Sequence, residues 1–382
     1  MLIFTIPGWY KSKKYPEASI FVFEQMKALV EEGDTIIVLN AQPVSLKSCN
    51  KPDKRIIYEN DHEVHTYTTE FKTLYPSKLR YSHILFYRLA IIKLFDQAIK
   101  DYGKPDVIYA HFSYPAGIVS VDLAKKYDIP LVVEEHFSGL METHIDKALL
   151  HCVKKTVAGS KSFIAVSSGL KLAIDKMLGR ETNIIIIPNM INEKFVFHDR
   201  INHDCFVFFA CGSLIPRKGF SELINAFADE FKNDNSVILR IGGSGEQMDK
   251  LKDLIAQTGM NGRVKLLGQL SREDTLREYI NCDCFVLPSK AETYGLVYRE
   301  AMAVGRPIIS TMHGGFGCQD WHEEYGKLIP VDDYTLLRES MRSVYTNYSD
   351  YDLNRISELC LMDCSKKSVA KLIHNELLKT IE

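Results

Sequence analysis

The sequence predicts an α/β protein built from two Rossmann-like domains, each a parallel sheet covered by helices. The chain has 382 residues, more than a single hydrophobic core usually fills. Short apolar runs alternate with amphipathic segments of helical period, which is typical of parallel βαβ units. A polar stretch at residues 192–204 interrupts this alternation, and a second series then begins. We therefore expect two similar domains that face each other across a cleft.

The first domain is predicted over residues 1–192 and the second over residues 200–365. The strands expected in the first are 2–6, 35–39, 106–111, 129–136, 162–167 and 183–189, and its helices are 21–33, 116–128 and 168–178. The strands expected in the second are 205–211, 236–243, 264–269, 284–289 and 306–311. An amphipathic segment, 366–382, ends the chain.

The composition is that of a folded protein, with 46% hydrophobic residues and a formal net charge of −2. No general attraction to nucleic-acid phosphates follows from this charge, so no nucleic-acid partner is expected. Nine scattered cysteines without paired CxxC motifs suit reduced thiols in the cytoplasm rather than a zinc site. The N-terminal lysines follow the apolar run, unlike those of a signal peptide. No segment approaches the about 20 apolar residues of a spanning helix, so any membrane contact is expected to be peripheral.

Several polar or aromatic side chains are expected at the carboxyl edge of the first sheet. Ligands of open α/β sheets bind at this edge. Gly8, Trp9 and Tyr10 follow the first strand, and His111 and His136 end two later strands. A single strand-end histidine is usually structural, but two at equivalent edges favour a functional role. Trp9, Tyr10 and His136 are the candidates for the acceptor side of the site.

The most informative stretch is SKAETYGLVYREAMAVGRPIIST, in the second domain. Glu292 is expected in the loop after a strand and Glu300 inside the next helix, so the two carboxylates can bind different ends of one ligand. Gly295 allows close approach of the backbone and leaves the amide groups of Tyr294, Gly295 and Leu296 free at the helix N-terminus. Such a terminus suits a pyrophosphate. On spacing alone, an ordinary strand-loop-helix unit with solvated glutamates remains the alternative.

Two glycine-containing loops follow other strands of the second domain. In ACGSLIPRKGF, which contains Gly212, Arg217 and Lys218 can together neutralise a departing diphosphate. Adjacent basic residues in a turn are also often only solvated surface. In IGGSGEQMDKL, Gly243 is expected either near a nucleotide or in a simple turn. A dinucleotide fingerprint is excluded because its third glycine would fall at Met248.

Residues 67–95 interleave tyrosine and phenylalanine with five basic residues. Such a mixture suits a membrane interface that holds a lipid-linked acceptor. The alternative, which we favour from the sequence, is an amphipathic helix packed on the first domain.

Together these segments resemble the retaining glycosyltransferases of family four (group 1), which have the GT-B fold. The E-x7-E signature and its AMAxGxPII continuation match residues 292–308, and IPN at 187–189 resembles the family's IPNG segment. SIFVFEQMKALVEEGDTIIVL, at 19–39, looks like the family's GIFVxEQAxALxxxGHxVxVL. The E-x7-E spacing alone is weak, but its order with RKG, GGSGE and GRP is specific, and the likeness covers almost the whole chain.

The resemblance implies a role for each matching position. Glu300 would bind the ribose hydroxyls of the nucleotide, Glu292 would bind hydroxyls of the transferred sugar, and Lys218 would contact the diphosphate. His111 would lie near the donor sugar and the reaction centre. Gly8 would belong to a loop that faces the diphosphate.

The resemblance also implies the reaction. The expected activity is retaining transfer of a sugar from a nucleotide sugar, UDP-linked by frequency in the family, to a glycan or lipid-linked acceptor in polysaccharide, capsule or lipopolysaccharide assembly. No metal is implied, because no DxD motif follows a strand end, and Asp350 and Asp352 lie in a polar segment. The first domain would bind the acceptor and the second the donor, and helix 366–382 would pack back on the first. The expected location is the cytoplasm, at the inner face of the membrane if the acceptor is lipid-linked.

Three departures from the family pattern leave sugar specificity open. Ser213 stands where the family often has arginine, so Arg217 must supply the second positive charge if the reaction needs one. Phe316 follows Gly314 and Gly315, where an acidic residue is usual. The first-domain loop is PGWYK rather than a double glycine.

Two other functions fit the same fold. A non-catalytic protein that binds nucleotide sugars or glycans keeps the site for binding only. A nucleotide-sugar epimerase would release UDP without an acceptor hydroxyl and interconvert sugars.

Overall fold

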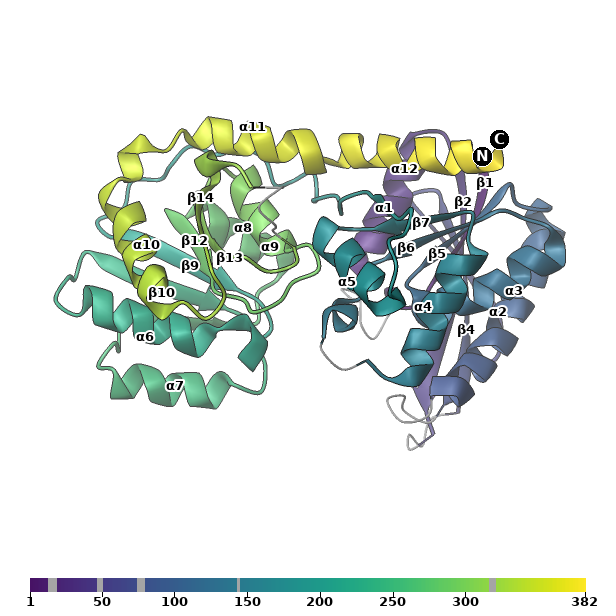
Figure 1. Cartoon of the computed structure of the whole chain (residues 1–382), viewed down its shortest axis with the longest axis horizontal. Helices are drawn as coiled ribbons and strands as arrows, with labels where there is room; N and C mark the ends of the chain where they lie inside the picture. Colours follow the sequence, from purple (N-terminus) through teal and green to yellow (C-terminus); the bar gives the residue numbers. More distant parts are fainter. Residues whose placement is uncertain (13–18, 47–50, 74–79, 143–144, 316–320) are drawn as a thin grey trace. The chain divides into compact units, whose positions relative to one another are not determined.

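The computed structural model describes residues 1–12, 19–46, 51–73, 80–142, 145–315 and 321–382. The chain forms two compact units (Figure 1). Unit 1 comprises Met1–Met190 and Lys366–Glu382, and unit 2 comprises Ile191–Ser365. Each unit contains one largely or wholly parallel sheet with helices on both faces. The predicted fold class, two Rossmann-like α/β domains, is therefore confirmed.

Unit 1 has an eight-stranded sheet in the order β3-β4-β2-β1-β5-β6-β7-β8. Its strands are β1 (Leu2–Pro7), β2 (Thr35–Ser45), β3 (Ile57–Asp61), β4 (Val64–Thr73), β5 (Val107–His111), β6 (Leu131–Glu135), β7 (Ser162–Ala165) and β8 (Ile185–Ile186). Only the β3–β4 pair is antiparallel among the paired strands that the structure describes. The strand order reverses between β1 and β5, and ligands of open α/β sheets bind at the carboxyl side of such a point.

The helices of unit 1 are α1 (Ile20–Glu31), α2 (Arg80–Tyr102), α3 (Ile118–Tyr127), α4 (Lys147–Gly159), α5 (Ser168–Leu178) and α12 (Lys366–Ile381). Figure 1 shows α1 and α12 on one face of the sheet and α2, α3 and α4 on the other. Buried apolar side chains of α12 join those of α1 and the central strands in one core. The buried carboxylate of Asp34 binds both the N-terminal ammonium group at 3.0 Å and His374 of α12 at 2.8 Å. The last helix therefore completes the core of unit 1.

Part of the segment expected as one amphipathic stretch, residues 67–95, is a strand. β4 continues to Thr73 and pairs with β2 and β3, and the helix α2 begins at Arg80. The residues of β4 alternate between buried and half-buried, and threonine, tyrosine and phenylalanine favour strands. Residues 74–79 lie outside the described part of the chain. Two further differences in unit 1 concern its edge strands. β3 was not predicted, and β8 covers only two residues of the expected 183–189.

Unit 2 has a six-stranded parallel sheet in the order β11-β10-β9-β12-β13-β14. Its strands are β9 (Phe206–Cys211), β10 (Val237–Gly242), β11 (Val264–Gly268), β12 (Cys284–Leu287), β13 (Ile308–Thr311) and β14 (Gly326–Ile329). Its helices are α6 (Phe220–Phe231), α7 (Met248–Gln257), α8 (Arg272–Ile280), α9 (Leu296–Ala303), α10 (Tyr334–Thr346) and α11 (Leu353–Cys364). The strand order reverses between β9 and β12, so the loops after these two strands meet at the edge where ligands bind.

A search of the described helices finds none with the length and hydropathy required to cross a membrane.

The packing of α12 gives a direct stability test. Ile373 is fully buried in the core of unit 1, whereas its neighbour Leu372 is 47% exposed. Replacing a buried isoleucine by alanine removes apolar contacts and leaves a cavity, which costs about 2–5 kcal/mol. Ile373→Ala should therefore lower the free energy of unfolding by this amount in urea denaturation, while Leu372→Ala should change it by less than about 1 kcal/mol. Equal effects of the two substitutions would contradict the docking of α12.

Candidate active site

Two loops of unit 2 meet beyond the carboxyl ends of β9 and β12. The first ends in a 3-10 turn at Pro216–Lys218, and its Arg217 carbonyl oxygen accepts the backbone amide of Lys290 at 2.8 Å. Gly219, which follows the turn, has φ +73°, and a Cβ atom there would lie 2.3 Å from the carbonyl oxygen of Pro288. Only glycine allows both this left-handed backbone and this close approach. The contact therefore fixes one loop against the other.

This contact places Lys218 beside Glu292. The ammonium group of Lys218 forms an ion pair and hydrogen bond with Oε1 of Glu292. The hydroxyl of Ser289 donates to the same oxygen at 2.9 Å. The two charged side chains are only 13% and 11% exposed, so solvent screens their field weakly. Two residues predicted to act on one ligand are thus brought together.

Gly212 and Gly243 let two backbone segments pack closely together beside Lys218. A Cβ atom on Gly243, where φ is +139°, would lie 1.9 Å from the carbonyl oxygen of Gly212. The side chain of Lys218 passes 3.6 Å from the position of a Cβ on Gly212. Larger residues at these positions would separate the loops after β9 and β10 or displace Lys218. Gly243 therefore shapes the site through loop packing.

The N-terminus of α9 lies in the loop that carries Glu292. Its N-cap residue, Gly295, has φ +77° and provides no side chain for capping, and a Cβ there would lie 2.8 Å from the ring of Tyr298. Within the described residues, no side chain caps this terminus. Its leading amide groups, around Tyr294, Gly295 and Leu296, can therefore bind an anion.

Glu300 is held inside unit 2 by two residues that the sequence analysis missed. Its side chain is buried, and Oε1 lies 3.3 Å from the guanidinium of Arg272. Oε2 accepts a hydrogen bond from the hydroxyl of Tyr279 at 3.4 Å. Both partners belong to α8, more than 20 positions before Glu300 in the sequence. No local sequence pattern predicts that Arg272 and Tyr279 contact Glu300, because these contacts depend on how α8 packs beside α9.

His313 is another missed residue of this region. Its Nδ1 accepts the backbone amide of Gly315 at 3.1 Å, and Nε2 lies 3.3 Å from the hydroxyl of Ser310. Burial lowers the pKa of His313 to about 4, so the imidazole is neutral near pH 7. In the sequence, the Gly-Gly pair that directly follows His313 was the one feature that could have pointed to this residue. Residues 316–318, which depart from the family pattern, lie outside the described part of the chain.

The side chain of Arg217 is half-exposed and makes no ion pair within the described residues. It precedes Lys218 in the same turn. A second positive charge is thus available at this loop, although the structure does not assign it a ligand.

In unit 1, His111 and His136 lie together at the carboxyl edge of the sheet. Nδ1 of His111 is 3.2 Å from Nε2 of His136, and the rings are stacked. Both are buried, and burial lowers the pKa of each, well below its ordinary value for His111 and to about 3 for His136. Nε2 of His111 has no hydrogen-bond partner among the described residues. The side chain of His111 is fully buried, so its predicted catalytic role remains a prediction.

Glu134, a residue not predicted from the sequence, completes this cluster. Its carboxylate accepts hydrogen bonds from the hydroxyl of Tyr109 and, at 2.9 and 3.1 Å, from the amide of Gln25. Its Oε1 lies 3.6 Å from Nε2 of His136. Burial raises the pKa of Glu134 to about 7, against the opposing effect of these hydrogen bonds. One ligand atom from each of Glu134, His111 and His136 lies within 4.8 Å of the others, so these residues could also hold a metal ion.

The three residues after β1 are placed differently from one another. The amide of Gly8 donates to the carbonyl oxygen of His111 at 3.1 Å, and a Cβ on Gly8 would lie 3.2 Å from the backbone of Tyr114. Trp9 is 40% exposed and packs edge-on against Phe112. Tyr10 is buried in the core of unit 1. Its role on the acceptor side, like those of Trp9 and His136, stays a prediction.

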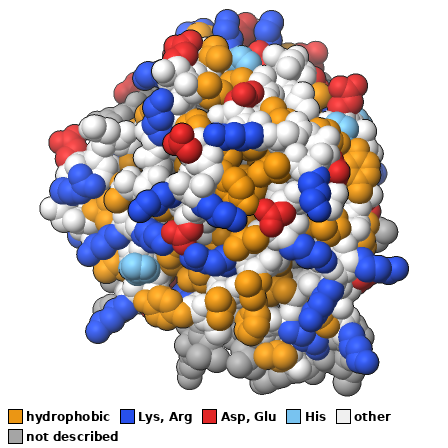
Figure 2. Space-filling view, turned by 90° about the vertical axis from the view of Figure 1, so that its right-hand side faces the viewer, with side chains coloured by type: hydrophobic (Ala, Val, Ile, Leu, Met, Phe, Trp, Pro, Cys, Tyr) orange, Lys and Arg blue, Asp and Glu red, His pale blue; other side chains and the backbone are white. Residues whose placement is uncertain are grey.

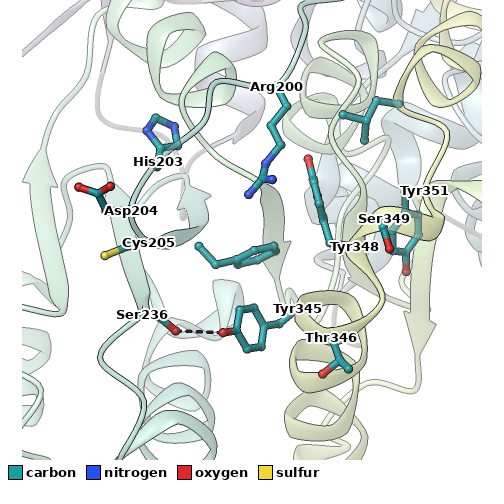
Figure 3. Close-up of a pocket in the computed structure, with 12 residues that line it drawn as sticks. Arg200, His203, Asp204, Cys205, Ser236, Tyr345, Thr346, Tyr348, Ser349 and Tyr351 are labelled. Carbon is teal, nitrogen blue, oxygen red and sulfur yellow. Dashed lines mark hydrogen bonds between the residues drawn. The ribbon is translucent and has the colours of Figure 1, made fainter.

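Two other features of unit 2 lie apart from this candidate site. Asp352 accepts the backbone amide of Arg355 at 2.9 Å and caps α11, so it serves as a structural carboxylate. A cavity of about 540 Å³ is lined by Arg200, Phe206 and Tyr348, among others (Figure 3). Since Phe206 begins β9, this cavity lies at the amino edge of the sheet, opposite the edge that carries Lys218.

Two family models match the chain one after the other. The model of Glycosyltransferase Family 4 matches residues 18–195, and the model of Glycosyl transferases group 1 matches residues 192–358. The chain belongs to the group 1, or family four, glycosyltransferases. Its two parallel-sheet domains have the GT-B architecture that was expected.

Two relatives of this glycosyltransferase share about a quarter of its residues over the matched lengths. An uncharacterized glycosyltransferase of Methanocaldococcus jannaschii is 28% identical over 213 residues, which span 56% of this chain and 57% of the relative. A putative teichuronic acid biosynthesis glycosyltransferase of Bacillus subtilis is 25% identical over 332 residues, 82% of each chain.

Solved structures share the fold of this glycosyltransferase. A sucrose-phosphate synthase from Thermosynechococcus elongatus matches with a TM-score of 0.78 and 18% identity, covering 99% of both chains. The protein HepE of Anabaena, in complex with UDP, matches with a TM-score of 0.73 and 18% identity, covering 99% of this chain and 100% of HepE.

The loop contact at Gly219 can be tested against a matched glycine. Gly179 has a similar φ of +68°, but a Cβ there would meet nothing within 4 Å. Gly179→Ala should cost only the left-handed backbone penalty, about 1 kcal/mol. Gly219→Ala should cost a further 1–3 kcal/mol or so, because the clash with Pro288 forces the loops apart. It should also raise the KM for the sugar donor, whereas Gly179→Ala should not. Unchanged donor kinetics in Gly219→Ala would contradict the role given to the contact.

Glu134 gives a pH-dependent prediction. Its pKa is raised from 4.5 to about 7 in the folded protein, so its contribution to stability is fully present below about pH 4.5 and is lost as the pH rises through about 7. Glu134→Gln removes this loss. Between about pH 5 and pH 8, the free energy of unfolding of the wild type should therefore fall relative to Glu134→Gln, by up to about 3 kcal/mol. Urea denaturation at both pH values measures the difference, with the exposed Glu142→Gln as control. A pH-independent difference would contradict the raised pKa.

Proposed function

We propose that this glycosyltransferase is retaining and metal-independent, and that it transfers a sugar from a UDP-sugar to a glycan or lipid-linked acceptor. The observation that carries the proposal is the group of positive charges in unit 2. Lys218, Arg217 and the uncapped N-terminus of α9 all belong to the loops that meet beyond β9 and β12. A diphosphate is the ligand that such a group best neutralises.

In the proposed reaction, the bond between the anomeric carbon and the diphosphate oxygen breaks. The acceptor oxygen bonds to the same carbon on the face that the diphosphate leaves, and the acceptor proton passes to the departing diphosphate. Negative charge grows on that diphosphate in the transition state. Lys218 and the amide groups of α9 are preorganised to stabilise it, which is electrostatic catalysis.

The ion pair with Glu292 gives Lys218 a defined position before the donor binds. Glu292, in turn, is fixed by Ser289 and has a second oxygen to offer to the sugar hydroxyls. Glu300, oriented by Arg272 and Tyr279, is proposed to accept hydrogen bonds from the ribose hydroxyls. Glu292 and Glu300 are eight positions apart in the chain, so their carboxylates can bind different parts of one donor.

The proposed metal independence rests on the same positive charges of unit 2. A divalent cation in glycosyl transfer would neutralise the diphosphate, and Lys218 and Arg217 supply that charge from the protein. The only DxD sequence considered above ends at Asp352. The carboxylate of Asp352 already caps the N-terminus of α11. We therefore expect transfer to persist in the presence of EDTA.

UDP and a glycan acceptor are supported by comparison rather than by geometry. One solved relative in fold, HepE, was determined with UDP and with UDP-glucose. A relative in sequence is described as a putative teichuronic acid biosynthesis enzyme. For unit 1 we propose acceptor binding, with the exposed Trp9 as a flat surface on which a sugar ring can stack.

A donor panel tests the proposal. Nucleotide release is measured with UDP-, GDP- and ADP-sugars in the presence of EDTA, with and without candidate glycan acceptors. Wild type should release nucleotide from one donor class, with UDP expected. Lys218→Met should lower kcat by about 100-fold or more, because an interaction that strengthens in the transition state is lost. Glu300→Ala should act mainly on the donor KM.

The control is Lys252→Met, which removes an equally charged side chain from the exposed surface of unit 2, 61% exposed. It should leave release unchanged. Product analysis by NMR should show the donor's anomeric configuration, and an inverted product would refute retention. If the donor binds but no nucleotide is released with any acceptor, the non-catalytic alternative is favoured. Interconversion of the donor sugar without an acceptor would favour an epimerase.

A further inference from the structure

Helix α2 of unit 1 is apolar on its outer side as well as on its inner side. Its inner residues, such as Ile84, Ile91 and Leu94, are buried against the sheet. On the outer side, four large residues are exposed: Tyr81 at 61%, Leu85 at 54%, Phe86 at 42% and Leu89 at 58%. Their spacing of four, five and eight positions puts them on one side of the helix. We call these four residues the α2 apolar surface.

The α2 apolar surface lies on a face of unit 1 that is rich in basic side chains. Figure 2 shows this side of the molecule, where hydrophobic side chains gather and Lys and Arg side chains lie around them. The exposed lysines of this face include Lys93 on α2, Lys125 and Lys126 at the end of α3, and Lys154 on α4. The surface therefore combines an apolar centre with a basic rim.

The acidic groups on these helices are already paired or bonded. Asp122 of α3 binds both Arg88 and Lys155. Asp146, the N-cap of α4, binds Arg80 at 2.7 Å. Asp96 accepts a hydrogen bond from the hydroxyl of Tyr127 at 2.7 Å. These contacts tie α2 to α3 and α4. The ion pairs compensate Asp122 and Asp146, whereas Asp96 and Asp101 of α2 are bonded only to neutral groups. The four exposed lysines outnumber these two carboxylates, so the rim is basic.

We propose that the α2 apolar surface is a docking site for an anionic lipid bilayer. The four apolar side chains enter the boundary between headgroups and acyl chains, and the lysines of the rim bind lipid phosphates. An apolar helix face of this size, flanked by basic residues, is the pattern of helices that lie in a membrane interface. Each lysine near an anionic surface adds to the attraction.

The charge of the rim distinguishes a bilayer from a second copy of the chain. In a symmetric dimer through this surface, the same patch meets itself, so the lysines of one copy would face those of the other. Repulsion between them opposes that contact, whereas anionic phosphates are complementary to it. A bilayer is also the place where a lipid-linked acceptor is found, so the inference extends the proposed function. Vesicle binding is measured without sugar transfer, so the membrane proposal and the proposed function can fail independently of each other.

The test is cosedimentation with vesicles of phosphatidylcholine, with or without phosphatidylglycerol. The wild type should bind the vesicles that contain phosphatidylglycerol, and high salt should weaken that binding. Leu85→Glu/Leu89→Glu should lower the binding at least about tenfold, because two acidic groups replace the apolar anchors in the interface.

The matched control is Leu172→Glu/Met362→Glu, which makes the same chemical change at residues that are 65% and 69% exposed elsewhere. It should bind vesicles like the wild type. Circular dichroism and nucleotide release confirm that both double variants are folded. The proposal is overturned if the wild type does not bind phosphatidylglycerol vesicles, or if both double variants lose binding equally. It is also overturned if the wild type is a dimer in solution that only Leu85→Glu/Leu89→Glu dissociates.

Discussion

The close contact between Gly219 and the carbonyl oxygen of Pro288 is the constraint on which the candidate donor site depends. Lys218 and Glu292 are 74 positions apart in the chain, and they meet because this contact joins the loops after β9 and β12. The parallel order of the sheet brings the loops to one edge, and the glycine removes the side chain that would keep them apart. The same loop then leads into α9, whose N-terminus Gly295 leaves uncapped. Cation, carboxylate and amide groups are thus fixed by backbone packing.

Much of the fold could be predicted because its elements carry strong local signals. The buried strands β1, β5 and β9 are continuous apolar runs, and α5 and α12 have clear amphipathic periods. β4 was missed because its threonine and aromatic residues resemble the composition of α2, the next described element of the sequence. The docking of α12 on unit 1 was implied only by the family resemblance. It depends on Asp34, His374 and a shared core, which are contacts between distant parts of the sequence.

The residues of the candidate site also fall into those predictable from local motifs and those that depend on distant contacts. Glu292, Glu300, Lys218 and the glycines were predictable because each stands in a short motif after a strand. Arg272 and Tyr279 were not, since they reach Glu300 from another helix. Glu134 was hidden inside an apolar strand, where only the fold reveals that Gln25 and Tyr109 satisfy it. The burial of Tyr10 could not be predicted, because a strand-end position alone does not tell whether a side chain turns outward or into the core.

The central claim is that Lys218 recognises a diphosphate. Calorimetric titration of wild type and Lys218→Met with UDP, UMP and uridine, or with the corresponding nucleotides of the active donor, tests it most directly. The account predicts that UDP binds the wild type at least about tenfold more tightly than UMP, because a charge-assisted hydrogen bond contributes about 1.5–3 kcal/mol. This increment should largely disappear in Lys218→Met, while the affinity for uridine should not change. Equal affinities of the wild type for UDP and UMP, or an increment that Lys218→Met leaves intact, would contradict the account.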